Sequence, residues 1–279
     1  LFGPMAIGTA VAASCTWNPV SGNWGTAANW SCGVVPGNVD SATIATGRTT
    51  TINSAQQVQN LTNAGSVNID AFLLTLAGGG GTTNTGTINV GAGPIPNNAA
   101  LNVSAGHNII NTGGVINISA DSVLNQFGST ITGGTINTTG TGRVVLFNNS
   151  ANYFNNVTLN GKADLATATG VLRVINGFTL NGSASIDNGS LINLEGTQTI
   201  GGTGSFVFGS TGNNRLGVDG GGIITTLGAN TTVRGHTGSI GLGQLVNGSG
   251  NALINNGAGF AVIFHYFKAV TGHWRFVES

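Results

Sequence analysis

The stretch TGTINV, at residues 85–90, recurs in altered form along the chain and decides the fold. The box returns as GGVINI (113–118), GGTINT (133–138) and GSLINL (189–194), and its Ile-Asn steps therefore recur at unequal spacings. A second box, NVTLNG (156–161), returns as GFTLNG (177–182). Loose internal repeats with a period of about 20–30 residues indicate a solenoid, in which each repeat stacks on the next.

Within each repeat, apolar residues alternate with small polar ones. A threonine separates Val157 from Leu159 and Phe178 from Leu180, and this period of two is typical of a half-buried strand. Gly and Asn bound each run and supply turns with positive φ. The pattern predicts an all-β fold: a parallel β-helix, or β-solenoid, over residues 41–258. It would contain about nine or ten coils of about 21 residues, each with three short strands.

The composition narrows the possible functions. Only 6% of the residues are charged, and the formal net charge is zero. A nucleic-acid binder concentrates Lys and Arg on one face, so we do not expect nucleic acid as a partner. The chain is 40% hydrophobic despite 48 glycines, which is enough for a core. Asparagines at equivalent turns can hydrogen-bond from coil to coil, and nothing in the sequence indicates a cofactor or a metal site.

The segment before the repeats has a different composition. Residues 15–44, CTWNPVSGNWGTAANWSCGVVPGNVDSATI, hold both cysteines, Cys15 and Cys32, and three of the four tryptophans, Trp17, Trp24 and Trp30. A coil stack exposes a strand edge at each end, so residues 15–40 are predicted to form a cap. An even cysteine count in a secreted chain suggests a Cys15–Cys32 disulfide; two free thiols are the alternative. A carbohydrate-stacking role for the tryptophans stays open.

The two ends of the chain are interpreted separately from the repeats. Residues 1–14 are small and apolar and resemble the end of a secretory signal segment, of which they would be a remnant. The tail, residues 259–279, includes FAVIFHYFKAVTGHWRFVES (260–279), which is either a C-terminal cap or non-native sequence. No apolar run reaches the roughly 20 residues of a transmembrane helix.

The opening segment resembles the N-terminal region of filamentous-haemagglutinin-like and autotransporter-passenger proteins of Gram-negative bacteria. The residues that carry this resemblance are Cys15, Trp17, Gly22–Trp24, AANWS (27–31), Cys32, Pro36 and Asp40. The later stretches GTQTIGGTGSFVFG (196–209) and GANTTVRGHTGSIG (228–241) also look like coils of that family. The resemblance implies a right-handed β-helix that is secreted or associated with the outer membrane at the bacterial cell surface, and a chain that is a fragment of a longer passenger.

Acidic residues that could carry catalysis are sparse. A glycosidase needs two carboxylates about 5–10 Å apart, and the candidate pairs are Asp164 with Asp187 and Asp187 with Glu195. Since Asp often serves turns, we expect turn roles for these residues instead.

The basic residues and threonines give no stronger signal. Arg143 and Arg173 could align but have no acid cluster in the sequence beside them, so they are interpreted as exposed strand residues. His107 and His236 lack an orienting acid and are interpreted as structural or solvated. Thr-x-Thr pairs, which can bind ice, occur without an array from coil to coil: Thr49/Thr51 and Thr197/Thr199.

These observations favour a structural or adhesive protein with no catalysis. It would present repetitive strand faces to glycans or proteins of a host or neighbouring cell. The alternative is a carbohydrate-binding or polysaccharide-cleaving β-helix, such as a lyase, a glycosidase or a tailspike-like domain.

Overall fold

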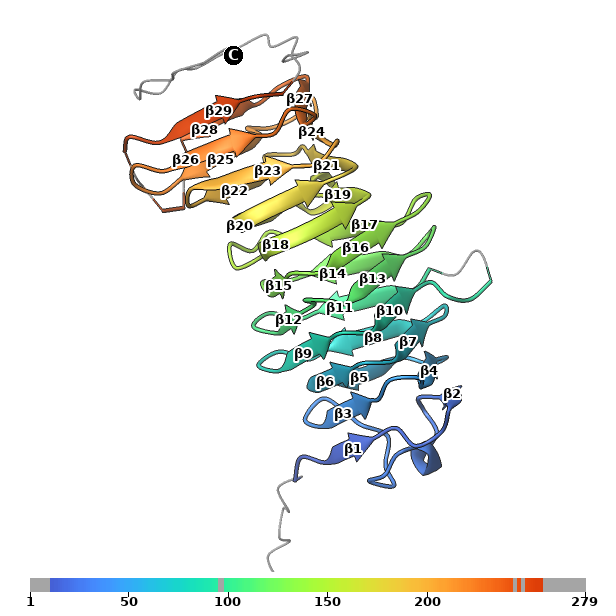
Figure 1. The fold of residues 1–279 in the computed structure, drawn as a ribbon. Helices are drawn as coiled ribbons and strands as arrows, with labels where there is room; N and C mark the ends of the chain where they lie inside the picture. Colours follow the sequence, from blue (N-terminus) through green and yellow to red (C-terminus); the bar gives the residue numbers. More distant parts are fainter. Residues whose placement is uncertain (1–10, 95–97, 243–244, 247–248, 258–279) are drawn as a thin grey trace, which may run out of the picture.

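Short parallel strands stacked coil upon coil form a rod that runs from the N-terminal to the C-terminal end (Figure 1). The computed structural model describes residues 11–94, 98–242, 245–246 and 249–257. The predicted aromatic tail, residues 259–279, and most of the predicted signal remnant lie outside these ranges. The predicted parallel β-helix is confirmed, since the strands pair in parallel from coil to coil.

Each full coil contributes one strand to each of three columns. The first column contains β1 (Ser14–Thr16), β3 (Ser41–Ile44), β6 (Asn60–Asn63), β9 (Gly81–Asn84), β12 (Asn108–Ile110), β15 (Thr130–Thr132), the first halves of β18 (Tyr153–Asn160) and β20 (Val171–Leu180), β22 (Leu191–Glu195), β25 (Arg215–Asp219) and β28 (Ser239–Leu242). The second column contains β2 (Ser21–Asn23), β4 (Thr49–Ile52), β7 (Ser66–Ile69), β10 (Thr87–Val90), β13 (Val115–Ile118), β16 (Thr135–Thr138), the second halves of β18 and β20, β23 (Gln198–Gly201), β26 (Ile224–Leu227) and β29 (Ala252–Asn255).

The third column is a separate nine-stranded sheet. It contains β5 (Gln56–Val58), β8 (Leu73–Leu76), β11 (Ala100–Val103), β14 (Val123–Gln126), β17 (Arg143–Leu146), β19 (Lys162–Asp164), β21 (Ser183–Ile186), β24 (Ser205–Phe208) and β27 (Thr232–Gly235). The first two columns join into one 20-stranded sheet because β18 and β20 run through the corner between them.

The coils keep their register although their lengths differ. Ser41 pairs with Asn60, 19 residues later, whereas Asn84 bonds through its side chain to Asn111, 27 residues later. The coils are thus irregular in length, as the unequal spacings of the sequence boxes indicate, and the predicted coil of about 21 residues lies within their range. Strand lengths stay nearly constant, so the corners absorb the difference.

Alternate side chains of each strand point into the rod and stack on their counterparts in the next coil. One such stack, fully buried, runs through the second column in strict register: Val67, Ile88, Ile116, Ile136, Leu159 and Leu180. A fully buried aliphatic side chain contributes about 1.5–3 kcal/mol relative to an exposed one. Each repeated box of the sequence thus corresponds to one strand, whose alternating residues point into the core and out to the surface.

The corner after β20 shows why glycine follows asparagine there. A Cβ atom added to Gly182 would overlap the carbonyl oxygen of Gly161 in the preceding coil. Only glycine allows two backbones to approach so closely. At the corner between the first and second columns, Asn156 and Asn176 adopt positive φ, which asparagine tolerates better than most residues.

Helices contribute almost nothing to the described part of the chain. Its two helical turns, η1 (Ala27–Asn29) and η2 (Ala166–Ala168), are three residues long. No helix of these residues could cross a bilayer. The right-handed sense of the coil stays a prediction.

Candidate functional site

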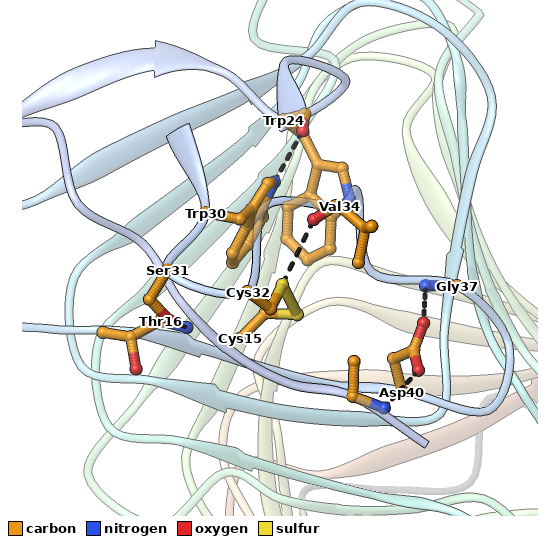
Figure 2. Close-up of a disulfide and its surroundings, with 10 residues drawn as sticks. Cys15, Thr16, Trp24, Trp30, Ser31, Cys32, Val34, Gly37 and Asp40 are labelled. Atoms are coloured by element: carbon orange, nitrogen blue, oxygen red, sulfur yellow. Dashed lines mark hydrogen bonds between the residues drawn. A yellow bond between two sulfur atoms is a disulfide. The ribbon is translucent and has the colours of Figure 1, made fainter. Parts of the chain in front are cut away.

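The N-terminal segment forms the first coil of the rod, so its strands belong to the same columns as the repeats. Strand β1 pairs with β3, and β2 pairs with β4, both in parallel. The predicted disulfide is confirmed: Cys15 is bonded to Cys32 (Figure 2). Cys15 itself is buried in the core.

The three tryptophans of this segment fill the end of the core. Trp17, Trp24 and Trp30 are 0%, 0% and 2% exposed. Trp30 meets the other two edge-to-face, at ring-centroid distances of 5.0 Å to Trp17 and 4.7 Å to Trp24, and its indole Nε1–H donates to the carbonyl of Trp24 at 2.8 Å (Figure 2). Because no ring face is open to solvent, these tryptophans offer no stacking platform to a sugar.

The strand edge below β1 is covered by the segment that carries Cys32. The backbone N–H of Thr16 donates to Ser31 Oγ at 2.9 Å, and the N–H of Ser31 donates back to the Thr16 carbonyl at 2.9 Å. The N–H of Asn18 donates to the carbonyl of Asn29 at 2.9 Å. Asp40 joins the two ends of the coil by accepting from the backbone of Ala13 and Gly37. Backbone groups that could have paired with another chain are thereby used internally.

Each acid considered for a catalytic pair from the sequence is engaged by other residues. Asp164 receives a bond from Arg143 Nε at 3.0 Å and caps Thr167. Asp187 accepts from the N–H and the hydroxyl of Thr211 in the next coil, at 2.9 and 2.8 Å. Burial alone would raise the pKa of Asp187, but these bonds outweigh it and hold the pKa below 3.8. Both acids therefore fasten coils together.

A charged cluster on the outer face of the first column was not predicted from the sequence. Arg173 pairs with both carboxylate oxygens of Glu195, at 2.5 and 2.8 Å, and its guanidinium lies 4.5 Å from the centre of the Tyr153 ring. The bond to Glu195 raises the pKa of Arg173 above its usual value, and burial raises the pKa of Tyr153. Arg143 and Arg173 are strand residues, as predicted, but both are half-buried and not exposed, and each has an acid partner.

Glu195 is in register with Asp219, one coil further along the same column. Asp219 is fully buried, and its Oδ2 accepts from Asn193 Nδ2 at 2.7 Å and from the backbone of Leu245 and Val246. The signal in the sequence was the recurrence of Arg173, Glu195 and Asp219 at intervals of about one coil. Because coil length varies, this recurrence did not show that the three residues lie in the same column.

The two described histidines have different environments. His107 is fully buried; its Nδ1 lies 2.7 Å from the carbonyl of Ala77, and its Nε2 lies 2.9 Å from Thr82 Oγ1. Because a carbonyl can only accept, Nδ1 carries the proton and Nε2 accepts from the threonine hydroxyl. Burial lowers the pKa of His107. His236 is exposed.

Two asparagine ladders run along the rod. The buried one joins Asn63, Asn84 and Asn111 by amide bonds of 2.7 Å. The outer one lies on the second column and begins at Asn68, which only accepts within the ladder. Each later amide donates from Nδ2 to the Oδ1 of the preceding coil at 2.8 Å: Asn89, Asn117, Asn137, Asn160 and Asn181. Coil-to-coil bonding of asparagine is thus present, as predicted, but most of the outer ladder lies within strands and not at turns. Asn193, from the fourth Ile-Asn box, lies in the first column instead.

A second outward row accompanies the outer ladder on the same face. Its members are in register from β4 to β20: Thr49, Ser66, Thr87, Val115, Thr135, Thr158 and Thr179. No array of Thr-x-Thr pairs forms from coil to coil, as expected, because Thr51 is in register with Asn68, and Ser66 and Val115 interrupt the row of Thr49. The sequence could not show this row, because the partners of Thr49 lie at unequal spacings.

Charge is distributed unequally among the three columns. The strands of the first column carry Arg173, Glu195, Arg215 and Asp219, and those of the third carry Arg143, Lys162, Asp164 and Arg234. Within the described residues, the strands of the second column carry no charged residue. One long face of the rod therefore carries mainly hydroxyl and amide groups from β4 to β20, with Val115 as an apolar member of its outward row.

Comparison with known proteins found no matching family model, curated protein or solved structure. Within the parts of the chain that the structure covers, no group of three or more His, Cys, Asp or Glu residues is placed to hold a metal ion.

Proposed function

We propose that this protein is a secreted or surface-exposed structural and adhesive β-helix, of the filamentous-haemagglutinin-like or autotransporter-passenger type. The observation that carries the proposal is the regular face of the second column, whose outward side chains repeat in register from β4 to β20. A face that presents the same groups at about 4.8 Å intervals suits repeated weak contacts with a partner.

The Cys15–Cys32 disulfide supports an extracellular location. Disulfides persist in oxidising compartments and are rare in the bacterial cytosol. In this chain the bond holds the segment that covers the first strand edge, where a secreted rod would otherwise pair with other chains.

The alternative function, polysaccharide cleavage, would depend on Glu195 and Asp219. Their positions on successive coils would suit a pair of catalytic carboxylates. However, both oxygens of Glu195 are engaged by Arg173, and Asp219 is fully buried. Neither carboxylate is placed to meet both a sugar and a water molecule, so the adhesive function is the better supported one.

The test is retention of cells by beads coated with the purified chain. We expect the folded chain to retain bacterial cells, and the reduced, heat-denatured chain not to retain them. A parallel assay would measure sugar release from a panel of polysaccharides. Sugar release by the native chain that is lost in Glu195→Gln would contradict the adhesive proposal and favour the enzyme, and absence of cell retention would also contradict adhesion.

A further inference from the structure

The outer face of the second column differs from the other two faces in both charge and order. From β4 to β20 it consists of the outer asparagine ladder and the threonine-rich row beside it, and all of these side chains except Asn181 are half-buried. The charged strand residues lie in the other two columns. The strand residues of this face therefore carry no charge, and its asparagine amides are held in position by their ladder bonds.

The ladder leaves hydrogen-bonding capacity unused. Asn89, Asn117, Asn137 and Asn160 each donate one amide hydrogen and accept one bond within the ladder. An amide has two hydrogens and two oxygen lone pairs, so each of these residues keeps one of each for a ligand. Because neighbouring amides already fix one another, binding would cost little additional side-chain entropy.

We propose that this face, from β4 to β20, binds an uncharged polysaccharide chain lying along the axis of the rod. The inference rests on the proposed adhesive function and names its binding face and its ligand class. Sugar hydroxyls both donate and accept hydrogen bonds, which matches amide and threonine groups that do the same. A polymer with repeated hydroxyls can contact several coils at once, and the weak contacts add through their effective concentration.

The size of the face argues against a second copy of the chain as its occupant. Four residues of strand span about 13 Å, and seven coils span about 30 Å, which gives about 400 Å². A stable protein interface buries about 800 Å² on each partner. A single extended polysaccharide is narrow enough to use this area fully.

The absence of charge on these strands argues against an acidic polysaccharide. Such a ligand would lose hydration of its carboxylates or sulfates without gaining a cationic partner, and the Arg and Lys residues of the described strands lie in the first and third columns. An ice surface would use the same rows, but Ser66 and Val115 interrupt the threonines. A rigid lattice requires a more uniform array than a single flexible chain does.

The test uses native gels cast with hydroxyethyl cellulose, galactomannan or alginate. We expect the two neutral polysaccharides, but not alginate, to retard the purified chain. The double variant Thr87→Lys with Thr158→Lys places two hydrated cations on the face and should weaken retardation by about tenfold. The control, Thr75→Lys with Thr130→Lys, adds the same charge at half-exposed threonines of the third and first columns and should behave like the native chain.

Circular dichroism would verify that both variants fold. Loss of retardation in both variants alike, retardation by alginate alone, or ice shaping without polysaccharide binding would each overturn the inference. Cell retention on beads separates the two proposals. Retention that survives Thr87→Lys with Thr158→Lys would refute this face and leave adhesion standing, whereas no retention by the native chain would refute adhesion itself.

Discussion

Thr16 and Ser31 form two reciprocal hydrogen bonds at the outer edge of the first coil, where no further coil of the described chain follows. The Thr16 N–H donates to Ser31 Oγ, and the Ser31 N–H donates to the Thr16 carbonyl, both at 2.9 Å. The disulfide at the adjacent residue, Cys32, holds this reciprocal pair in place. The cap thus occupies the backbone N–H and carbonyl of Thr16 in β1, and its tryptophans close the end of the core.

Removal of the disulfide should therefore destabilise the cap. We expect Cys15→Ser with Cys32→Ser to lower the free energy of unfolding by about 3 kcal/mol, and to increase aggregation because the β1 edge becomes accessible. Urea unfolding and light scattering would measure the two effects. Reduction of the native protein serves as the matched control and should have the same effect. Unchanged stability and light scattering in the double variant would contradict this role.

Trp30 and Trp17 should differ in how much stability they lose when the indole N–H is removed. Trp30→Phe leaves the Trp24 carbonyl without its donor, whereas Trp17→Phe removes a buried Nε1–H that has no acceptor among the described residues. Since both changes remove similar volume, Trp30→Phe should lower the free energy of unfolding by about 1 kcal/mol more than Trp17→Phe does. Equilibrium unfolding in urea measures the difference, and an equal or larger cost for Trp17→Phe would disprove this account.

The buried and outer asparagine ladders should also differ in their contribution to stability. Asn84→Ala leaves Asn111 Oδ1 and Asn63 Nδ2 without their ladder partners in the core, which costs about 1–3 kcal/mol for each unsatisfied group. Asn89→Ala, on the next strand of the same coil, interrupts the outer ladder where water can replace the amide. We expect Asn89→Ala to lower the free energy of unfolding by less than about 1 kcal/mol. Thermal unfolding of the two variants would compare them, and similar losses would contradict the distinction.

Stability should fall as the pH is lowered past 6.5. Burial lowers the pKa of His107, although its bond to the Ala77 carbonyl opposes the shift. Below pH 6.5 the unfolded chain gains a proton at this residue that the folded chain does not, so unfolding is favoured. The stabilising contribution of neutral His107 to the folded state is complete above pH 6.5, and it is lost as the pH falls towards the lowered pKa of the folded state. Urea midpoints from about pH 7.5 to about pH 5 would show the trend.

The variant His107→Gln should flatten this pH dependence. The matched control is His236→Gln, which changes an exposed histidine and should retain the native slope. Parallel slopes for the native protein and His107→Gln would exclude His107 as the cause.

Local patterns predicted the strands, because inward and outward positions alternate within each coil. The boxes at Asn89, Asn117 and Asn137 occupy equivalent positions in the outer ladder, as their likeness suggests. Asn193 belongs to the same kind of box but lies in another column, where it binds Asp219. A box identifies a strand, but it does not identify the column to which the strand belongs.

The assignment to columns depends on coil length, which the sequence does not display. Arg173 and Glu195 are 22 residues apart and meet across one coil step, whereas Arg143 and Arg173 lie in different columns. For the same reason, the separation of charge among the faces becomes visible only after the strands are placed. The disulfide was easier to predict, since the chain has two cysteines.

The corners absorb the difference between the short coil step from Ser41 to Asn60 and the long one from Gly81 to Asn108, which gives this architecture a capacity for insertion. Added residues at a corner change neither the register nor the core, so they cost chiefly loop entropy, which rises slowly with length. Mutation can therefore vary the corner loops that protrude from the rod while the strands stay unchanged. A protein of this kind can change the length of its surface loops without having to evolve a new fold.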